Sequence, residues 1–273
     1  MNPTKKRTGS MRPFKGKLEV ANGQIVGYAL TTGYARSGVY DVKDIGSFHS
    51  QTSENLWPFI YAVRENLIIE LDAQNYDGSG INWPDSAVTQ NNYAVLYNSP
   101  VYVSSGPVYF NFNGYSFAMI DSARTDEYSP AVGLGDFTFE IWLSMPSVGG
   151  YSHFIDFPSQ GAGRVYKQQN GSVYMVPYPD TAGPSTTQYI VPNTWTQLVV
   201  TRSDQVLYYY QDGLPKSHID NFYGFNLTSS ILSLRGSSER LDTSIGLFRM
   251  YNKYLNRFEV LQNFSVSRTR FGI

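Results

Sequence analysis

The sequence contains no cysteine, which excludes both a disulfide framework and a thiolate nucleophile. Charge is also scarce: only 16% of the residues are charged, and the formal net charge of −1 indicates no particular partner. The basic N-terminus is not followed by the apolar core of a secretory signal, and we expect no bilayer-spanning segment. Heptads, repeats, phosphate-binding loops, zinc spacings and dinucleotide fingerprints are missing too, so neither a fibre stalk nor a nucleotide site is predicted.

The chain is rich in aromatic residues and in residues that form turns. Its 273 residues include 22 Tyr, 16 Phe, 24 Gly and 14 Pro. This composition is typical of many short strands joined by tight turns. The chain is long enough to bury a full core.

The first 65 residues differ in character from the rest. Residues 1–18 contain no acid, whereas the remaining chain carries a formal −7. Residues 19–66 mix small polar residues with short apolar pieces and predict a connector with one or two short strands. We therefore expect an extended basic arm and connector over 1–65, anchoring the chain to partner proteins, and one domain over 66–273. The arm residues expected to contact partners are Lys5, Lys6, Arg7, Arg12, Lys15 and Lys17.

Beyond residue 66 the pattern predicts strands. Residues 137–144 alternate with period two and have one clearly apolar face, and the pairs Asn113-Gly114 and Asp212-Gly213 are turn signals at strand ends. The predicted strands cover residues 67–71, 107–112, 137–143, 172–176, 195–201, 205–211, 231–234 and 245–251.

One short helix is predicted over residues 256–264. Asn256 can cap it, and Glu259 lies three residues on, as in a capping box. Strands followed by a single small helix indicate an antiparallel sandwich, not alternating α/β units. The fold class expected is therefore all-β, with two antiparallel sheets, a short C-terminal helix and an extended N-terminal arm.

Four stretches, in this order, resemble the laminin-G-like, concanavalin-A-like jelly-roll family. They are NLIIELDA at 66–73 with WPDS at 83–86, FNG at 112–114 with DFTFEIW at 136–142, WTQLVVT at 195–201 with YQDG at 210–213, and IGLFRMYNKYL at 245–255 with EVLQNF at 259–264. Residues 149–189 depart from the family pattern, so no ligand-binding loop is carried over from it.

With its ending RTRFGI at 268–273, the sequence is most similar to domains in structural proteins of tailed bacteriophages. That resemblance implies a non-enzymatic virion protein, assembled in the host cytoplasm, with capsid decoration favoured over tail or neck. The arm would then bind other virion proteins, with neither membrane nor nucleic acid as a partner. Two alternatives stay open: an adhesin that binds host glycans, and a glycan-cleaving enzyme.

Glu140 and Trp142 share the face opposite the apolar one on their strand. In glycoside hydrolases of this fold, clustered carboxylates on one strand face supply the nucleophile and the acid. Positions 138 and 142 add no second acid here. We expect a structural role, with sugar contact as the alternative, and we expect Glu140→Gln to leave activity and folding close to unchanged.

An oxygen-rich stretch is the candidate metal site. Its residues are Asp72, Asn75, Asp77 and Asp85. Calcium takes six to eight oxygen ligands, but the position that an EF-hand fills with a bidentate acid is Trp83 here. Ordinary turns use the same residue types, so a calcium site and plain turn chemistry both remain open, and no other cofactor is predicted.

Tyrosines and histidines complete the candidates. Tyr208 and Tyr210 share one strand face, where they could stack on a sugar or pack against neighbouring strands. The three histidines, at positions 49, 153 and 218, lie far apart and form no recognisable catalytic motif.

Overall fold

A computed structural model describes most of the C-terminal part of the chain and one hairpin near the N-terminus. The chain divides into two compact units, Met1–Ile60 and Tyr61–Ile273. None of the helices within the described ranges is long and apolar enough to cross a membrane. The described residues are 18–21, 24–28, 61–87, 93–113, 115–120, 133–146, 152–156, 163–167, 171–177, 189–220, 232–234 and 242–273.

In the first unit, β1 (Leu18–Ala21) pairs antiparallel with β2 (Gln24–Tyr28). This hairpin falls in the stretch predicted to hold one or two short strands. The six basic residues of the predicted arm lie outside the described residues, so their contacts with partners stay a prediction.

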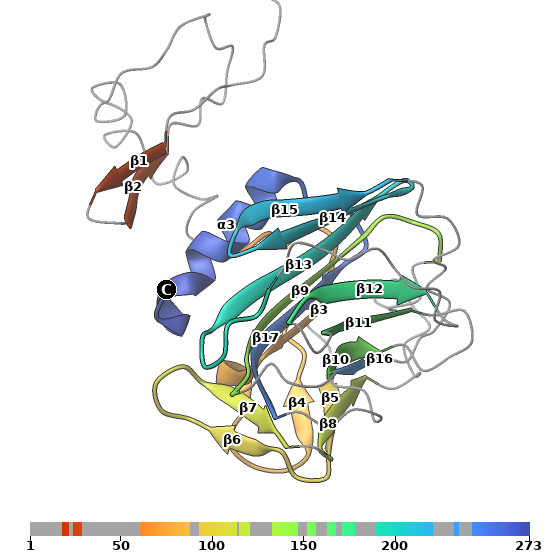
Figure 1. Cartoon of the computed structure of the whole chain (residues 1–273). Coiled ribbons are helices and arrows are strands. Elements are labelled where there is room, and N and C mark those ends of the chain that lie inside the picture. The colour runs from red at the N-terminus through yellow and green to blue at the C-terminus, as the bar shows by residue number, and fades with distance from the viewer. Residues whose placement is uncertain are drawn as a thin grey trace, which may run out of the picture. The chain divides into compact units, whose positions relative to one another are not determined.

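The second unit is a sandwich of two antiparallel sheets (Figure 1). The eight-stranded sheet has the order β15-β14-β13-β9-β17-β7-β6, and β3 pairs with β17 beside this path. Its strands are β3 (Leu67–Asp72), β6 (Val101–Val103), β7 (Tyr109–Phe112), β9 (Phe137–Ser144), β13 (Thr196–Ser203), β14 (Val206–Gln211), β15 (Leu214–Ile219) and β17 (Thr243–Tyr251).

The seven-stranded sheet has the order β12-β11-β10-β16-β8-β5-β4. Its strands are β4 (Asn82–Pro84), β5 (Tyr93–Tyr97), β8 (Phe117–Ile120), β10 (Ser152–Asp156), β11 (Gly163–Lys167), β12 (Val173–Pro177) and β16 (Leu232–Leu234). A 3-10 turn, η2 (Ala73–Asn75), follows β3.

The core between the sheets follows from the alternation seen in the sequence. On β9 the side chains of Phe137, Phe139 and Ile141 point inward, where they join buried residues of the opposite sheet such as Phe154 and Leu232. All eight predicted strands are present, and every described strand pair is antiparallel. The predicted all-β jelly-roll sandwich is confirmed.

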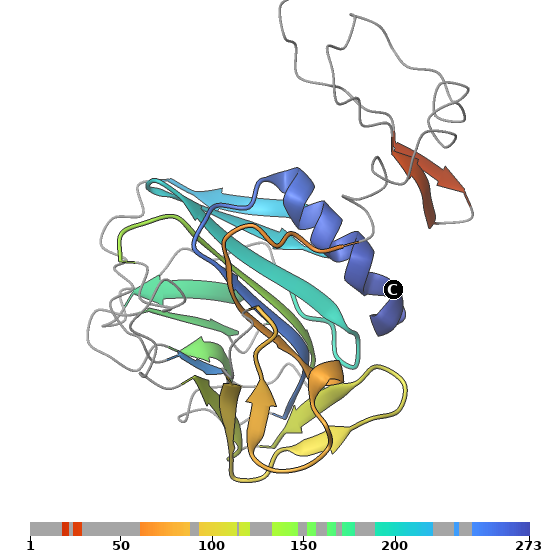
Figure 2. The same cartoon turned by 180° about the vertical axis from the view of Figure 1, so that it is seen from behind.

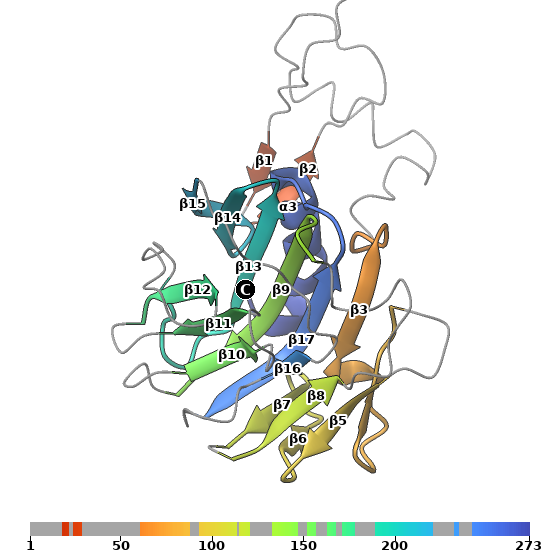
Figure 3. The same ribbon diagram turned by 90° about the vertical axis from the view of Figure 1, so that its right-hand side faces the viewer.

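A third layer covers the eight-stranded sheet. The helix α3 (Arg257–Ser267) and the 3-10 turn η3 (Arg268–Phe271) lie on the side of this sheet that faces away from the seven-stranded sheet, as Figures 2 and 3 show from two directions. The predicted capping box is present, with Asn256 and Glu259 exchanging hydrogen bonds at the start of α3. This layer decides what the candidate site residues can do.

Candidate functional site

Glu140 lies on the helix-covered face of β9 and is completely buried. Its Oε1 accepts hydrogen bonds from Gln197 Nε2 at 2.8 Å and Trp142 Nε1 at 3.2 Å. Its Oε2 accepts one from Asn263 Nδ2 of α3 at 2.7 Å. The carboxylate is thus held by groups from two strands and from the covering helix.

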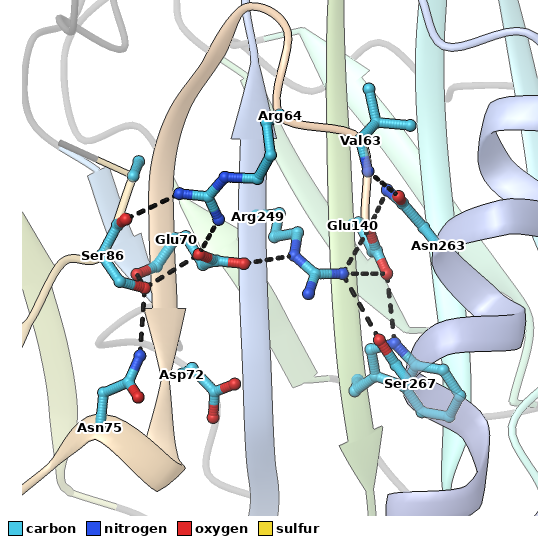
Figure 4. A network of polar contacts seen from close by, with 12 residues as sticks. Val63, Arg64, Glu70, Asp72, Asn75, Ser86, Glu140, Arg249, Asn263 and Ser267 are labelled. Carbon is cyan, nitrogen blue, oxygen red and sulfur yellow. Dashed lines mark hydrogen bonds and ion pairs between the residues drawn. The ribbon is translucent and has the colours of Figure 1, made fainter. Parts of the chain in front are cut away.

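Arg249 on β17 joins Glu140 to a second buried acid, Glu70 on β3. Its Nε donates to Glu70 Oε1 at 2.8 Å, and its Nη1 lies 3.3 Å from Glu140 Oε1 (Figure 4). The side chain of Glu70 also accepts from Arg64 and from the hydroxyl of Ser86. One buried guanidinium therefore neutralises two carboxylates, which is the condition under which buried charge is tolerated.

The same network fixes the segment that enters the domain. The amide of Val63 donates to Asn263 Oδ1 at 2.8 Å, and Tyr251 OH donates to the carbonyl oxygen of Val63 at 3.1 Å. Lys253 reaches Glu65 and Glu259, both at 2.8 Å. Residues 63–65, which precede β3, are consequently tied to both α3 and β17.

The pKa shifts of Glu70 and Arg249 agree with their pairing in this network. Burial raises the pKa of Glu70, but Arg249 and Arg64 outweigh burial and bring that pKa down from 4.5 to about 2. Burial lowers the pKa of Arg249, and the two neighbouring acids more than reverse this effect, so the guanidinium stays charged. Burial also raises the pKa of Tyr251, which keeps its hydroxyl neutral.

Trp142 is buried beside Glu140 under the same layer. Its ring stacks on Phe271, with centroids 4.4 Å apart, and lies parallel to Phe264, with centroids 5.7 Å apart. Sugar contact at Glu140 or Trp142 would need access that α3 and η3 remove. The alternative of sugar contact at these two residues is therefore corrected: their side chains belong to the interface between sheet and helix.

Each of the four candidate metal ligands is held by hydrogen bonds to nearby residues or by an ion pair. Asp72 caps η2 through the amide of Gln74 and pairs with Arg270 at 2.6 Å. Asp85 accepts from the amides of Glu70 and Ala87. The two others hold turn residues: Asn75 donates to the Ser86 hydroxyl, and Asp77 accepts from the amide of Ser79. No cluster of three or more His, Cys, Asp or Glu suited to a metal occurs among the described residues, and the calcium site stays a prediction.

The two candidate tyrosines line a pocket at the edge of the eight-stranded sheet. The pocket has a volume of about 160 Å³ and is lined by residues 208–210 and 215–218, from β14 and β15. Tyr208 is half-buried, and Tyr210 is almost fully buried in the pocket wall. The strand face on which these two residues were predicted to lie thus borders a surface depression.

The described histidines lie apart from one another. His153 is buried, with Nε2 3.2 Å from Nη1 of Arg164. His218 is exposed on β15, with Nε2 3.7 Å from a carboxylate oxygen of Asp220. His49 lies outside the described residues. The two described histidines are in different sheets.

Sequence reasoning missed most of these partners. Glu70 and Arg249 could have been found, because each is a charge flanked on both sides by apolar residues of its strand and the two charges are opposite. Asn263 and Gln197 offered no such signal, since the role of Asn263 depends on where α3 docks and that of Gln197 on the pairing of β13 with β9. Lys216 and His218, which line the pocket, lie on β15. This strand was not predicted because its sequence is polar.

Solved structures with a similar fold include toxin domains and an enzyme. The binding domain of botulinum neurotoxin DC in complex with SialylT has 13% identity and a TM-score of 0.60, over 74% of this chain and 51% of that chain. A structure of botulinum neurotoxin type C, whose cell entry is described as dependent upon interaction with two ganglioside molecules, has 14% identity and a TM-score of 0.58, over 74% of this chain and 51% of that chain.

A mutant of Trypanosoma rangeli sialidase displaying trans-sialidase activity has 19% identity and a TM-score of 0.57, over 78% of this chain and 34% of that chain. The chain therefore spans about half or less of the length of these proteins, and at such identities the likeness shows the fold alone. No curated protein matches the sequence. Residues 120–261, slightly more than half of the chain, match the laminin-G-type family described as the Concanavalin A-like lectin/glucanases superfamily, and the chain belongs to this family.

Proposed function

We propose that the protein is a non-enzymatic display protein whose jelly-roll domain binds glycans. One observation carries the proposal: Glu70 and Glu140 of the eight-stranded sheet are buried, while aromatic rings elsewhere stay at the surface. Glu140 and Glu70 are both bound to Arg249, Glu140 beneath α3 and Glu70 between Arg64 and Ser86. Tyr208 borders an open pocket, and Tyr97 and Phe117 stack with centroids 4.7 Å apart while half-exposed.

This contrast suits binding better than hydrolysis. A glycosidase needs two carboxyl groups that flank the scissile bond, with one of them free to take or give a proton. Glu140 accepts hydrogen bonds from three uncharged side chains and lies against a guanidinium, which leaves it no path to a substrate while α3 is in place. Exposed aromatic rings, in contrast, offer a stacking surface for sugars.

The relatives support the carbohydrate part of the proposal. The domain family is named for lectins and glucanases, and the similar structures include ganglioside-dependent toxins and a sialidase. We transfer from them only the class of ligand, a glycan.

A glycan array probed with the full chain tests the proposal, with a reducing-sugar assay on the same glycans. We expect binding to a defined subset of glycans and no release of reducing ends. Absence of binding across the array would overturn the glycan-binding function. Release of reducing sugar that disappears in a Glu140→Gln variant would overturn the non-enzymatic one.

Display on the particle of a tailed phage, favoured at the capsid, stays a proposal that rests on the sequence resemblance and the basic arm. Residues 1–18 would bind other virion proteins and hold the domain outside the shell. A chain lacking residues 1–18 should fold but fail to join particles, and neutralising Lys5, Lys6 and Arg7 should weaken attachment and its dependence on salt. Normal incorporation of the truncated chain would contradict this role.

A further inference from the structure

Aromatic rings from three elements lie together at Tyr208, which lines the pocket at the edge of β14 and β15. The ring centroid of Tyr208 lies 5.5 Å from that of Tyr254, which precedes α3, and 6.2 Å from that of His218 on β15. Tyr208 is half-buried, so part of its ring is open to solvent at the pocket. These rings provide a surface on which the apolar face of a sugar ring can stack.

Hydroxyl groups lie beside the rings. Burial raises the pKa of Tyr210, and the neighbouring Tyr254 and Tyr208 raise it further, while Arg257 acts in the opposite direction. The Tyr210 hydroxyl therefore stays neutral throughout the physiological pH range, and it is hydrogen-bonded to Tyr254 in the pocket wall. Ser217 adds another hydroxyl to the lining.

Charged side chains of both signs lie around the pocket. Lys216 and His218 are in the lining, and the guanidinium of Arg257 acts on Tyr210 from the start of α3. Asp220 lies next to His218, at 3.7 Å. Asp212 interacts with Lys216 but is half-buried, and its Oδ1 accepts the amide of Gln197. Among the lining residues Lys216 supplies a positive charge and no acid supplies a negative one, which favours a negative group of a ligand at Lys216.

Size and backbone chemistry narrow the choice of ligand. Pockets for drug-sized molecules hold roughly 300–1,000 Å³, so about 160 Å³ suits one sugar residue, not a chain lying through the site. The rim strand β15 contains Pro215, which has no amide hydrogen, and its pairing with β14 shifts register at Tyr209/Tyr210. Both features oppose the addition of a peptide strand at this edge.

We propose that this pocket binds a single carboxylated sugar residue at the end of a glycan, with the sugar ring on Tyr208 and its carboxylate towards Lys216. The proposal rests on the glycan-binding function proposed above and names both its site and its ligand class.

Titration calorimetry of the full chain with glucuronic acid and with glucose tests it, because these two sugars differ only in the carboxylate at the sixth carbon. N-acetylneuraminic acid serves as a second acidic probe. We expect at least one acidic sugar to bind about fivefold or more tightly than glucose, a difference of roughly 1 kcal/mol.

Four variants locate the site. Lys216→Gln should weaken acid binding about fivefold, and Lys216→Arg should restore most of it. Tyr208→Ala should abolish measurable binding, whereas Tyr208→Phe keeps the ring and should stay within about twofold of the parent. Tyr115→Ala is the matched control, because it removes a tyrosine that is 65% exposed on another loop, and it should change nothing.

The outcomes separate this inference from the function on which it rests. Equal binding of glucose and glucuronic acid, or an equal effect of Tyr208→Ala and Tyr115→Ala, overturns the acidic-sugar site and leaves glycan binding intact. If the glycan array also shows no binding, the proposed function fails as well. Loss of acid binding in Lys216→Gln but not in Lys216→Arg supports the site.

Discussion

The outer faces of the two sheets differ in which side chains are buried and which are exposed. On the eight-stranded sheet, Glu70, Glu140 and Arg249 are charged and yet less than 8% exposed. On the seven-stranded sheet, Tyr97 and Phe117 are aromatic and yet half-exposed, and Tyr93 is 44% exposed. Strand alternation puts both sets on the outer face. What distinguishes them is the cover over the first sheet. α3 contacts Glu140 and Arg249, and Arg64 and Ser86 contact Glu70, so these polar positions become part of the core.

The covered face is built as a second core. Apolar groups flank the charged network on both sides, with Leu67, Tyr251 and Val260 on one side and Trp142, Leu247 and Phe271 on the other. An arrangement of this kind raises the strength of each charged contact, and it also makes the loss of one partner costly. The predictions below measure how firmly the covered face depends on its charges and on α3.

The largest effect is expected from Arg249→Met. The variant leaves two buried carboxylates without their shared cation, and we expect the free energy of unfolding to fall by about 3–5 kcal/mol. Arg257→Met, at an exposed position on α3, should change it by no more than about 0.5 kcal/mol. Urea unfolding measures both. Equal losses would show that the network contributes nothing special to the covered face.

The next largest effect is expected from acid, which should lower the stability of the covered face. Because the pKa of Glu70 falls from 4.5 to about 2 on folding, its contribution is complete above the unfolded value and is lost as pH drops from 4.5 through 2. The parent should lose up to about 3 kcal/mol over this window. Glu70→Gln should be less stable at neutral pH and should show a flatter acid limb. Parallel acid limbs in the two proteins would contradict the assignment.

Part of the covered sheet was predictable because its strand β9 has one regularly apolar face and turn signals mark the ends of other strands. Residues 137–144 alternate cleanly, and the capping box at Asn256 and Glu259 marks α3. The seven-stranded sheet was harder to predict. In β5, the inward Ala94 and Leu96 are interleaved with outward residues that are also apolar or aromatic, so the period of two disappears.

The polar partners could not be predicted for a different reason. Glu70 and Arg249 are 179 positions apart, and Glu140 and Asn263 are 123 apart. Contacts over such distances depend on the pairing of β3 with β17 and on the docking of α3, which no local pattern encodes. The same limit explains why the sequence allowed for sugar contact at Glu140 and Trp142.

An effect of intermediate size on stability is expected where α3 packs closely on the sheet at Gly213. Gly213 and Gly80 have similar positive φ angles of 74° and 79°. A Cβ at Gly213 would lie 2.9–3.0 Å from atoms of Phe264, whereas one at Gly80 meets nothing within 4 Å. Gly213→Ala should therefore cost about 1–3 kcal/mol more than Gly80→Ala in urea unfolding. Equal costs would mean that the helix is free to shift.

The smallest effect is expected from calcium removal. Asp72 is already paired with Arg270, and Asp85 accepts backbone amides, so plain turn chemistry explains these residues. We expect the melting temperature to be the same with and without a chelator. A clear fall with chelator, restored by added calcium, would instead place a stabilising cation in the domain.

The most direct test of the account is Glu140→Gln, with stability and sugar binding measured on the same preparation. The sequence alone led us to expect unchanged folding, but burial of Glu140 against Arg249 predicts a loss of about 2 kcal/mol or more. Affinity for the best sugar found should stay within about twofold of the parent, equivalent to less than about 0.5 kcal/mol. Unchanged stability together with lost binding or lost hydrolysis would contradict the account and return the acid to a functional site.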